Sequence, residues 1–162
     1  MAQSPTPMTM TLAQQADYRF ETRFDAGALP AMTTDLMPPL GSGRGPNPEQ
    51  LLGAAVANCL AASLLYSLRR YKVAAEPLRA EASVTEARNA KNRLRIGHIG
   101  VDLHLGAVGA GAELLPRVLA QFEDFCTVTQ SIRAGIEVDV RVHGADGALL
   151  WPPAEDGAAP PA

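Results

Sequence analysis

The stretch of sequence that decides the fold runs from Pro46 to Tyr71 and reads PNPEQLLGAAVANCLAASLLYSLRRY. Asn47 is a favourable N-cap residue, and Pro48 follows at the first helical position, where its missing N–H costs nothing. Gln50 stands three residues after the cap, where its side chain can bond back to the cap residue. No charged residue occurs between Leu51 and Leu68. The stretch therefore predicts one long helix that is apolar on all sides.

The length of this uncharged run raises the question of whether the helix crosses a membrane. The run approaches the ~20 residues that a membrane-spanning helix needs. However, Gly53, Asn58, Ser63 and Ser67 interrupt it, and much of the remainder is alanine, which is only weakly apolar. We therefore predict a core helix of a soluble domain. Because a monomer of this size would leave one side of such a helix in water, we also predict a homodimer.

Length and composition are those of an ordinary globular protein. The 162 residues are enough for one domain with a sizeable core. The net charge of −3 gives no basic surface, so we expect no nucleic-acid partner. The N-terminal residues show no positive segment followed by an apolar run, so we expect a cytoplasmic protein without a membrane partner. In that compartment the two cysteines would be reduced or redox-cycling.

The N-terminal third predicts a flexible tail and then strands. Residues 1–15 are rich in Thr, Pro, Gln and Met, which favours a flexible tail. Residues 18–24 alternate in polarity and predict a strand, and residues 29–36 predict a second, shorter one. One face of the first strand would carry the aromatic residues Tyr18, Phe20 and Phe24. The other face would carry the charged residues Arg19, Glu21 and Arg23.

The segment after the long helix predicts a β-hairpin. Residues 78–88 and 94–105 alternate in polarity on either side of a polar turn. A phase change near Gly97–Gly100 predicts a bulge in the second of these strands.

The C-terminal part predicts two helices and a last strand. Apolar residues at helical spacing predict a helix over residues 112–125. Thr127 and Gln130 predict a capped short helix that ends at Gly135, and residues 136–143 predict a strand. The order of elements gives the α+β class. We expect one domain over residues 16–150, followed by a flexible tail over residues 151–162.

The two cysteines are the strongest candidates for chemistry. Cys126 precedes the short helix, where exposed N–H groups would favour a thiolate. Cys59 lies in the middle of the long helix, and a buried cysteine can also be an inert small hydrophobic residue. An apolar environment disfavours a thiolate, so a reactive Cys59 needs a cationic neighbour, for which Arg19 and Arg23 are the candidates. The spacing of the cysteines does not decide whether their sulfurs meet.

Glu49 is the candidate carboxylate that would orient such a guanidinium. A glutamate in the first turn of a helix also has a structural role, because it complements the helix dipole. Ten residues of helix place Glu49 about 15 Å from Cys59 along the axis. An arginine that spans the gap, a break in the helix or the partner chain must therefore close this distance.

No pattern predicts a metal site or a bound cofactor. His98, His104 and His143 are scattered, and no spacing of Cys and His matches a zinc site. The glycine-rich segment 41–45 lacks the Gly-Lys-Ser/Thr ending of a phosphate-binding loop. We therefore expect neither a metal nor a cofactor.

Several segments resemble the OsmC/Ohr family, the osmotically inducible and organic hydroperoxide resistance proteins. The segments are residues 45–52, 54–55 and 58–60 around the first cysteine, and residues 122–126 and 135–138 around the second. The resemblance extends from about Tyr18 to Val142. Its specific part is the spacing of Glu49, Cys59 and Cys126.

The resemblance implies an intertwined homodimer of the OsmC-like fold, with an antiparallel sheet wrapped around the long central helix and two sites at the subunit interface. It implies a peroxidase in which Cys59 attacks the O–O bond of an organic hydroperoxide and becomes a sulfenic acid. Cys126 would then form a disulfide with Cys59, and a dithiol, lipoyl-bearing in some members, would reduce it. Active members hold the thiolate with an arginine of the N-terminal hairpin, paired with the carboxylate that corresponds to Glu49. Here Arg19 and Arg23 are both candidates.

Two functions follow from this comparison of residues. The first is reduction of organic hydroperoxides in the response to oxidative stress, since an apolar pocket favours an alkyl peroxide over hydrogen peroxide. The second is a dimeric small-molecule-binding or thiol redox-sensing protein with little peroxidase activity. The second function would apply if neither arginine reaches Cys59.

Overall fold

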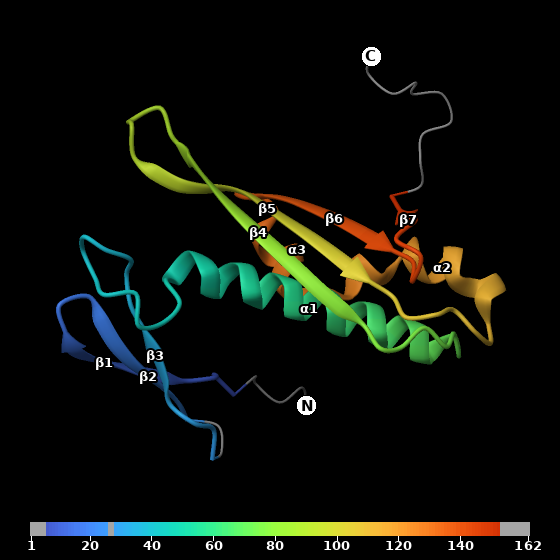
Figure 1. The fold of residues 1–162 in the computed structure, drawn as a ribbon, viewed down its shortest axis with the longest axis horizontal. Coiled ribbons are helices and arrows are strands. Elements are labelled where there is room, and N and C mark those ends of the chain that lie inside the picture. The colour runs from blue at the N-terminus through green and yellow to red at the C-terminus, as the bar shows by residue number, and fades with distance from the viewer. Residues whose placement is uncertain (1–5, 26–27, 153–162) are drawn as a thin grey trace. The chain divides into compact units, whose positions relative to one another are not determined.

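The computed structural model describes residues 6–25 and 28–152 and shows helix and sheet segregated along the chain, which is the predicted α+β class (Figure 1). The chain divides into two compact units, Met1–Leu51 and Leu52–Ala162. Among the described residues, each strand pairs only within its own unit. Each unit thus completes a β-sheet of its own, and the boundary falls inside the single domain expected over residues 16–150.

The N-terminal unit contains an antiparallel sheet of three strands in the order β1-β2-β3. The strands are β1 (Met10–Ala16), β2 (Arg19–Phe24) and β3 (Met32–Thr34). Strand β2 was predicted, and Thr22 is the buried residue of its apolar face. Strand β3 is shorter than the predicted segment 29–36 because the chain pairs with β2 only over Met32–Thr34.

The prediction of a flexible tail over residues 1–15 is wrong for residues 10–15, which belong to β1. Met10 pairs with Phe24 and Ala16 with Arg19, so the strand is held by backbone bonds along its length. Nearly all of its side chains are exposed, which is why the sequence shows no apolar face there. Residues 1–5 lie outside the described residues.

The loop that leads into the long helix is organised by a buried carboxylate. Asp35 accepts hydrogen bonds from the hydroxyl of Ser42 at 2.7 Å and from the backbone N–H groups of Ser42 at 3.1 Å and Arg44 at 3.2 Å. The Ser42 hydroxyl is the main cause that lowers the pKa of Asp35, and the backbone N–H groups add to it, against the effect of burial. Gly41 packs against both this carboxylate and the Leu36 carbonyl oxygen, and a Cβ at position 41 would clash with both groups. The carboxylate therefore stays ionised and fixes the path of the loop.

Helix α1 (Pro48–Arg70) begins as predicted. The Asn47 side chain accepts a hydrogen bond from the Gln50 N–H at 2.8 Å, and the Gln50 side chain accepts one from the Asn47 N–H at 2.9 Å. This reciprocal pair is a capping box, and its loss typically costs about 1 kcal/mol. The cap is local in sequence, which is why it could be predicted.

The C-terminal unit contains a four-stranded sheet in the order β4-β5-β6-β7. The strands are β4 (Arg79–Arg88), β5 (Leu94–His104), β6 (Glu137–His143) and β7 (Leu149–Trp151). The β4–β5 hairpin was predicted, and its register shifts between Thr85 and Glu86, opposite Gly97. The predicted bulge is therefore present. Strand β7 includes the first residue of the predicted C-terminal tail, and residues 153–162 lie outside the described residues.

The family resemblance led us to expect an antiparallel sheet, but this sheet is mixed. Strands β5 and β6 are parallel, with His104 opposite His143. Parallel neighbours need a long crossover connection, and here the segment between them carries the short helices. The other two strand pairs of this sheet are antiparallel.

The crossover contains three short helical segments in place of the predicted helix over residues 112–125. These are the 3₁₀ turn Ala112–Leu114, α2 (Leu115–Leu119) and the 3₁₀ turn Phe122–Phe125. The helix breaks at Gln121, whose φ of −135° is not helical, and the fully buried Phe122 follows. Burial of this side chain, which can contribute about 2 to 3 kcal/mol, thus overrides the helical pattern.

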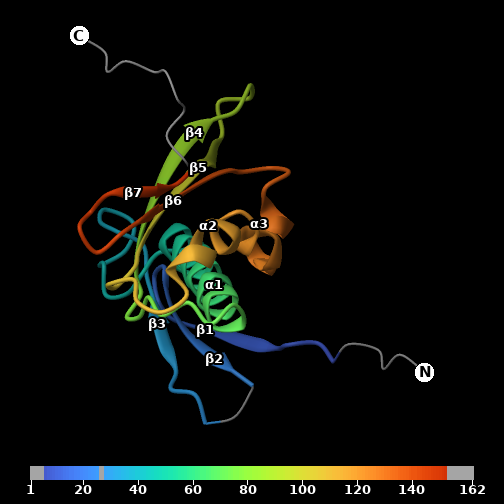
Figure 2. The same ribbon diagram turned by 90° about the vertical axis from the view of Figure 1, so that its right-hand side faces the viewer.

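The core of the C-terminal unit lies between α1 and one face of the sheet, with α2 and α3 (Thr127–Ile132) beside α1 (Figures 1 and 2). Every fourth residue of α1 from Val56 to Leu68 is buried, which forms a continuous apolar stripe. The partners of this stripe on β5 and β6 are Ile99, Val101, Leu103, Val138, Val140 and Val142. Gly53 allows the close approach of β4, since a Cβ there would lie 2.6 Å from a methyl group of Val84.

Among the described helices, α1 alone is long and apolar enough to cross a membrane by length and composition. Its buried stripe nevertheless packs against the sheet, as expected for a core helix. The opposite face of α1 carries exposed, uncharged side chains, namely Ala55, Asn58, Ala62 and Tyr66. A surface helix normally carries charges on such a face.

Candidate thiol site

The first candidate residue, Cys59, lies near the middle of α1 and is partly buried. Its neighbours in the helix differ sharply, because Leu60 is fully buried and Asn58 is exposed. Cys59 therefore sits at the border between the apolar stripe and the exposed face. A small molecule can approach this position from solvent, whereas it could not reach the centre of the stripe.

The second candidate residue, Cys126, is fully buried at the N-cap position of α3. Its backbone is fixed on both sides, because its N–H donates to the Glu123 carbonyl oxygen at 3.0 Å and its carbonyl oxygen accepts from the Gln130 N–H at 3.0 Å. Its Sγ donates to Oγ1 of Thr129 at 3.0 Å. Thr127, the predicted cap, is instead the first residue of α3, since the chain enters the helix one residue earlier.

The structure brings the two cysteines close enough for their thiols to interact, and both are free thiols. Burial is the largest cause that raises the pKa of Cys126, and the neighbouring Cys59 thiol raises it further. Hydrogen bonds with the side chain and the backbone of Thr129 act in the opposite direction. The expectation of a thiolate at Cys126 is therefore wrong. The six-residue helix that follows has too few aligned peptides to offset complete burial of the sulfur.

Two aromatic rings lie on the same segments as the thiols, and neither was predicted as part of the site. Tyr66 lies about two turns of α1 after Cys59, and Phe125 directly precedes Cys126. The two rings meet edge to face, with centroids 6.0 Å apart. Tyr66 is 54% exposed and Phe125 is 46% exposed, so the pair presents an apolar surface to solvent. Helical spacing from Cys59 was the signal that could have identified Tyr66.

The remaining predicted site residues belong to the N-terminal unit. Arg23 is exposed and forms an ion pair with Glu21 at 2.6 Å within its own strand. Arg19 is the first residue of β2 and is partly buried. Glu49 stands in the first turn of α1, and the helix is unbroken between Glu49 and Cys59. A break in the helix therefore does not bring this carboxylate to the thiol. A cation beside Cys59 stays a prediction.

The three histidines lie on neighbouring strands of the four-stranded sheet, His98 and His104 on β5 and His143 on β6. Over residues 6–25 and 28–152, no group of three or more His, Cys, Asp or Glu side chains could hold a metal ion. His104 and His143 stack with ring centroids 4.9 Å apart, as their positions in the β5–β6 register require. His143 contacts Asp102 at 2.7 Å, and Arg141 donates two hydrogen bonds to the same carboxylate. This Asp102 cluster (Asp102, Arg141 and His143) links β5 to β6.

The side chain hydrogen bonds of Arg141 and His143 lower the pKa of Asp102 from 3.8 to about 2, with the Arg141 bond as the larger cause and burial opposing both. The carboxylate is therefore ionised at any physiological pH. His98 makes a similar but more exposed contact with Asp139 at 3.0 Å. These pairs join strands, so we assign them a structural role.

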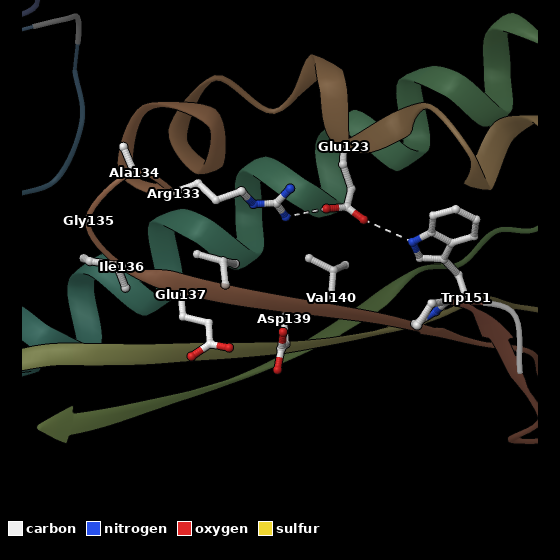
Figure 3. A pocket seen from close by; sticks show the side chains of 11 residues that line it. Glu123, Arg133, Ala134, Gly135, Ile136, Glu137, Asp139, Val140 and Trp151 are labelled. Carbon is white, nitrogen blue, oxygen red and sulfur yellow. Dashed lines mark hydrogen bonds and ion pairs between the residues drawn. The ribbon is translucent and has the colours of Figure 1, made fainter. Parts of the chain in front are cut away.

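A separate groove lies between β6 and the loop that follows α3 (Figure 3). It has a volume of about 690 Å³. Glu123 crosses it, with an ion pair to Arg133 and a hydrogen bond from the Trp151 ring N–H at 3.1 Å. Glu123, Arg133 and Trp151 thus bind one another and fix the end of α3 and strand β7.

Comparison with known proteins supports the fold. Residues 41–141 match the family model described as OsmC-like protein, which is more than half of the chain. The matched range includes Glu49, Cys59 and Cys126. None of the curated proteins matches the sequence.

Solved structures with the same fold share little sequence with this chain. The OsmC-like protein of Mycoplasma pneumoniae has a TM-score of 0.72 at 12% identity, over 87% of this chain and 99% of that one. An OsmC-like protein of unknown function from Vibrio cholerae has a TM-score of 0.71 at 13% identity, over 85% and 99%. The organic hydroperoxide resistance protein OhrB of Bacillus subtilis has a TM-score of 0.64 at 17% identity, over 85% and 98%.

Proposed function

Because the chain belongs to the OsmC-like protein family, we propose that it is a thiol-dependent organic hydroperoxide reductase. The observation that carries this proposal is the contact between a partly exposed thiol, Cys59, and a fully buried one, Cys126. Two such thiols can pass through a sulfenic acid to a disulfide without a metal or a cofactor. The similarity to organic hydroperoxide resistance proteins points to the same substrate class.

The difference in exposure assigns the roles of the two thiols. Cys59 attacks the peroxide, since it is the sulfur nearer to solvent. The O–O bond breaks, the alcohol leaves, and Cys59 becomes a sulfenic acid. The Cys126 sulfur then attacks the Cys59 sulfur, the S–O bond breaks, and the Cys126 proton leaves with the hydroxyl group as water. An external dithiol, such as a lipoyl group, reduces the disulfide and is itself oxidised.

The surroundings of Cys59 favour a peroxide with an apolar body. The Tyr66–Phe125 pair offers aromatic surface close to the thiols. Each CH₂ group that an alkyl hydroperoxide buries there contributes about 0.8 kcal/mol, a gain that hydrogen peroxide does not have. We therefore expect alkyl or aryl hydroperoxides to be preferred.

We also propose that the active form is a homodimer located in the cytoplasm, where dithiol reductants are available. The exposed face of α1 supports this, because Ala55, Asn58, Ala62 and Tyr66 leave it without charge. Arg19 or Arg23 would then hold the Cys59 thiolate, oriented by Glu49, from the same or the partner chain. Arg23 would have to leave Glu21 to do so.

A short chemical experiment tests the proposal. The reduced protein is treated with one equivalent of cumene hydroperoxide, quenched in acid and digested for mass spectrometry. The proposal expects a disulfide between Cys59 and Cys126 within seconds. Two free thiols at that time, or at a tenfold excess of peroxide, would contradict it. Hydrogen peroxide at the same concentration is the control and should react more slowly.

The second candidate function is a binding or redox-sensing protein of the same fold with little peroxidase activity. The ion pair of Arg23 with Glu21 favours it, because it occupies one of the two candidate guanidiniums. A sensor would form the same disulfide but would not turn over with a dithiol. Steady-state consumption of cumene hydroperoxide in the presence of dihydrolipoamide separates the two functions.

A further inference from the structure

Thr129 is the polar partner of the buried thiol, and the reaction steps proposed for the two cysteines give it no role. Cys126 and Thr129 are both 0% exposed, and their Sγ and Oγ1 atoms are 3.0 Å apart. Thr129 lies three positions after Cys126, so that the first turn of α3 places the hydroxyl beside the sulfur. Complete burial means that water does not compete for this contact. The environment of the sulfur is thus set by Thr129 and by Cys59.

The chemistry of a hydroxyl group fits this position. A threonine hydroxyl can accept one hydrogen bond and donate another, and it rotates to suit its partner. In the structure the Cys126 thiol donates to Oγ1. When the sulfur is ionised, the same hydroxyl can turn and donate to it. Together with the backbone hydrogen bond of Thr129, this donor offsets part of the cost of burying the charge.

We propose that Thr129 is a positioning residue of the buried thiol, which holds the Cys126 sulfur for reaction with Cys59 and donates a hydrogen bond to it whenever it carries negative charge. The part of this inference that concerns catalytic turnover rests on the proposed function. During the condensation that forms the disulfide and water, the Cys126 sulfur gains negative charge as its proton leaves. It does so again if an external dithiol attacks Cys59 and displaces Cys126 as a thiolate. Thr129 would stabilise the charged sulfur in both directions.

A second hydroxyl on the same helix shows the structural alternative and supplies a matched control. The Ser131 hydroxyl donates to the Thr127 carbonyl oxygen at 2.7 Å and is exposed. This contact is the common bond of a helical serine to the backbone one turn earlier. Ser131 therefore has no part in the thiol pair. Replacing it with alanine changes α3 without changing the environment of Cys126.

The first experiment measures the ionisation of Cys126 itself and needs no peroxidase activity. The protein is labelled with ¹³C at cysteine in a Cys59→Ser background, so that one thiol remains, and the Cys126 Cβ shift is followed against pH by NMR. Thr129→Val removes the hydroxyl at nearly constant volume and should raise the pKa of Cys126 by about one unit. Thr129→Ser should restore the original titration, and Ser131→Ala should leave it unchanged. Superimposable titrations of Thr129→Val and its parent would overturn the proposal.

A second substitution protects the experiment against a folding defect. If Thr129→Val is unfolded by circular dichroism, Thr129→Ala is used, because it also removes the hydroxyl and cannot overpack the site. If the Thr129→Ala variant titrates at the same pH as its parent, the proposal is overturned, just as it would be by an unchanged Thr129→Val variant. Both variants are compared with Thr129→Ser at the same temperature and salt concentration.

The second experiment measures the effect on reaction steps in the protein with both cysteines. After one equivalent of cumene hydroperoxide, acid-quench mass spectrometry follows the Cys59 sulfenic acid and the disulfide over time. Thr129→Val should form the sulfenic acid at the parent rate but convert it to disulfide about tenfold more slowly, which corresponds to one unit of pKa. Thr129→Ser should recover the rate. An unchanged conversion in Thr129→Val would contradict the role in turnover.

The two experiments fail separately. If no variant consumes peroxide while the NMR titrations differ as expected, the proposed function is wrong and the role of Thr129 at the sulfur stands. If peroxide is consumed but the titrations coincide, the reductase stands and the role of Thr129 is wrong.

Discussion

The thiol of Cys126 at the start of α3 lies beside the thiol of Cys59 in the middle of α1, close enough for the two groups to interact. The whole β4–β5 hairpin and the first part of the crossover, up to Phe125, lie between them in the chain. Both elements that carry the thiols are tied to the same core, since Leu60 next to Cys59 and Phe122 before Cys126 are fully buried. The contact is therefore set by the packing of the core.

The different exposure of the two thiols predicts different effects of their removal. Cys59→Ser should abolish turnover of cumene hydroperoxide, because the reacting sulfur is lost. Cys126→Ser should leave one stoichiometric turnover per subunit, because the sulfenic acid still forms but cannot condense with a second thiol. Peroxide consumption is measured in burst and steady-state phases. Ala148→Ser, in an exposed turn away from the thiols, is the control.

Equal activity of Cys59→Ser and the wild type would refute the assigned roles. A burst that survives in Cys59→Ser but not in Cys126→Ser would reverse them.

The raised pKa of Cys126 predicts how stability changes with pH. Burial, the largest cause, raises the pKa of this thiol above its usual value of 9.0. The unfolded chain therefore loses the proton at a lower pH than the folded one. The stabilising contribution is complete below the usual value and is lost as the pH rises through the folded-state pKa. Urea unfolding should show that, between pH 7 and pH 10, the free energy of unfolding falls more for the wild type than for Cys126→Ser.

Cys59→Ser is the matched control for this measurement, since it keeps the buried thiol. It should lose stability with pH as the wild type does. Identical losses in the wild type and Cys126→Ser would show that the buried thiol titrates at its usual pH.

The predictable parts of this fold depend on signals that are local in sequence. The start of α1 follows from Asn47 and Gln50, whose side chains cap each other within one turn. The β4–β5 hairpin follows from alternation around a polar turn, and Gly97 marks the bulge. Tertiary contacts did not need to be known for either element.

The unpredicted parts depend on contacts between distant segments. Strand β1 exposes most of its side chains, so its existence depends on backbone pairing with β2. The break at Gln121 reflects burial of Phe122 against α1 and the sheet. At the site, the identity of both cysteines could be predicted, but their contact and the protonated state of Cys126 could not, because both depend on complete burial.

The Asp102 cluster predicts a second pH effect, with the opposite sign. Hydrogen bonds from Arg141 and His143 lower the pKa of Asp102 from 3.8 to about 2. A lowered pKa stabilises the fold at pH values above the pKa of Asp102 in the unfolded chain. This contribution of about 2 kcal/mol is lost as the pH falls through the pKa of Asp102 in the folded protein. Asp102→Asn should therefore destabilise the protein by a similar amount at pH 7 and by much less near pH 2.

The matched control is Asp139→Asn, because Asp139 also contacts a histidine on the neighbouring strand but is 65% exposed. Exposed pairs contribute at most about 1 kcal/mol, so this variant should unfold near the wild-type urea midpoint. If both substitutions lower the free energy of unfolding equally at pH 7, the Asp102 cluster stabilises the fold no more than an exposed pair does.

The exposed face of α1 predicts that a single charge will disrupt self-association. Ala62 lies on this face between Asn58 and Tyr66, and all three are exposed in the single chain. Ala62→Arg would bury a guanidinium in a symmetric interface, where each copy meets the other, and the desolvation should cost several kcal/mol. Light scattering after size exclusion should show a dimer for the wild type and a monomer for Ala62→Arg. Ala148→Arg, in an exposed turn, should remain dimeric. A dimer for both variants would place the interface elsewhere, and a monomeric wild type would contradict the proposed assembly.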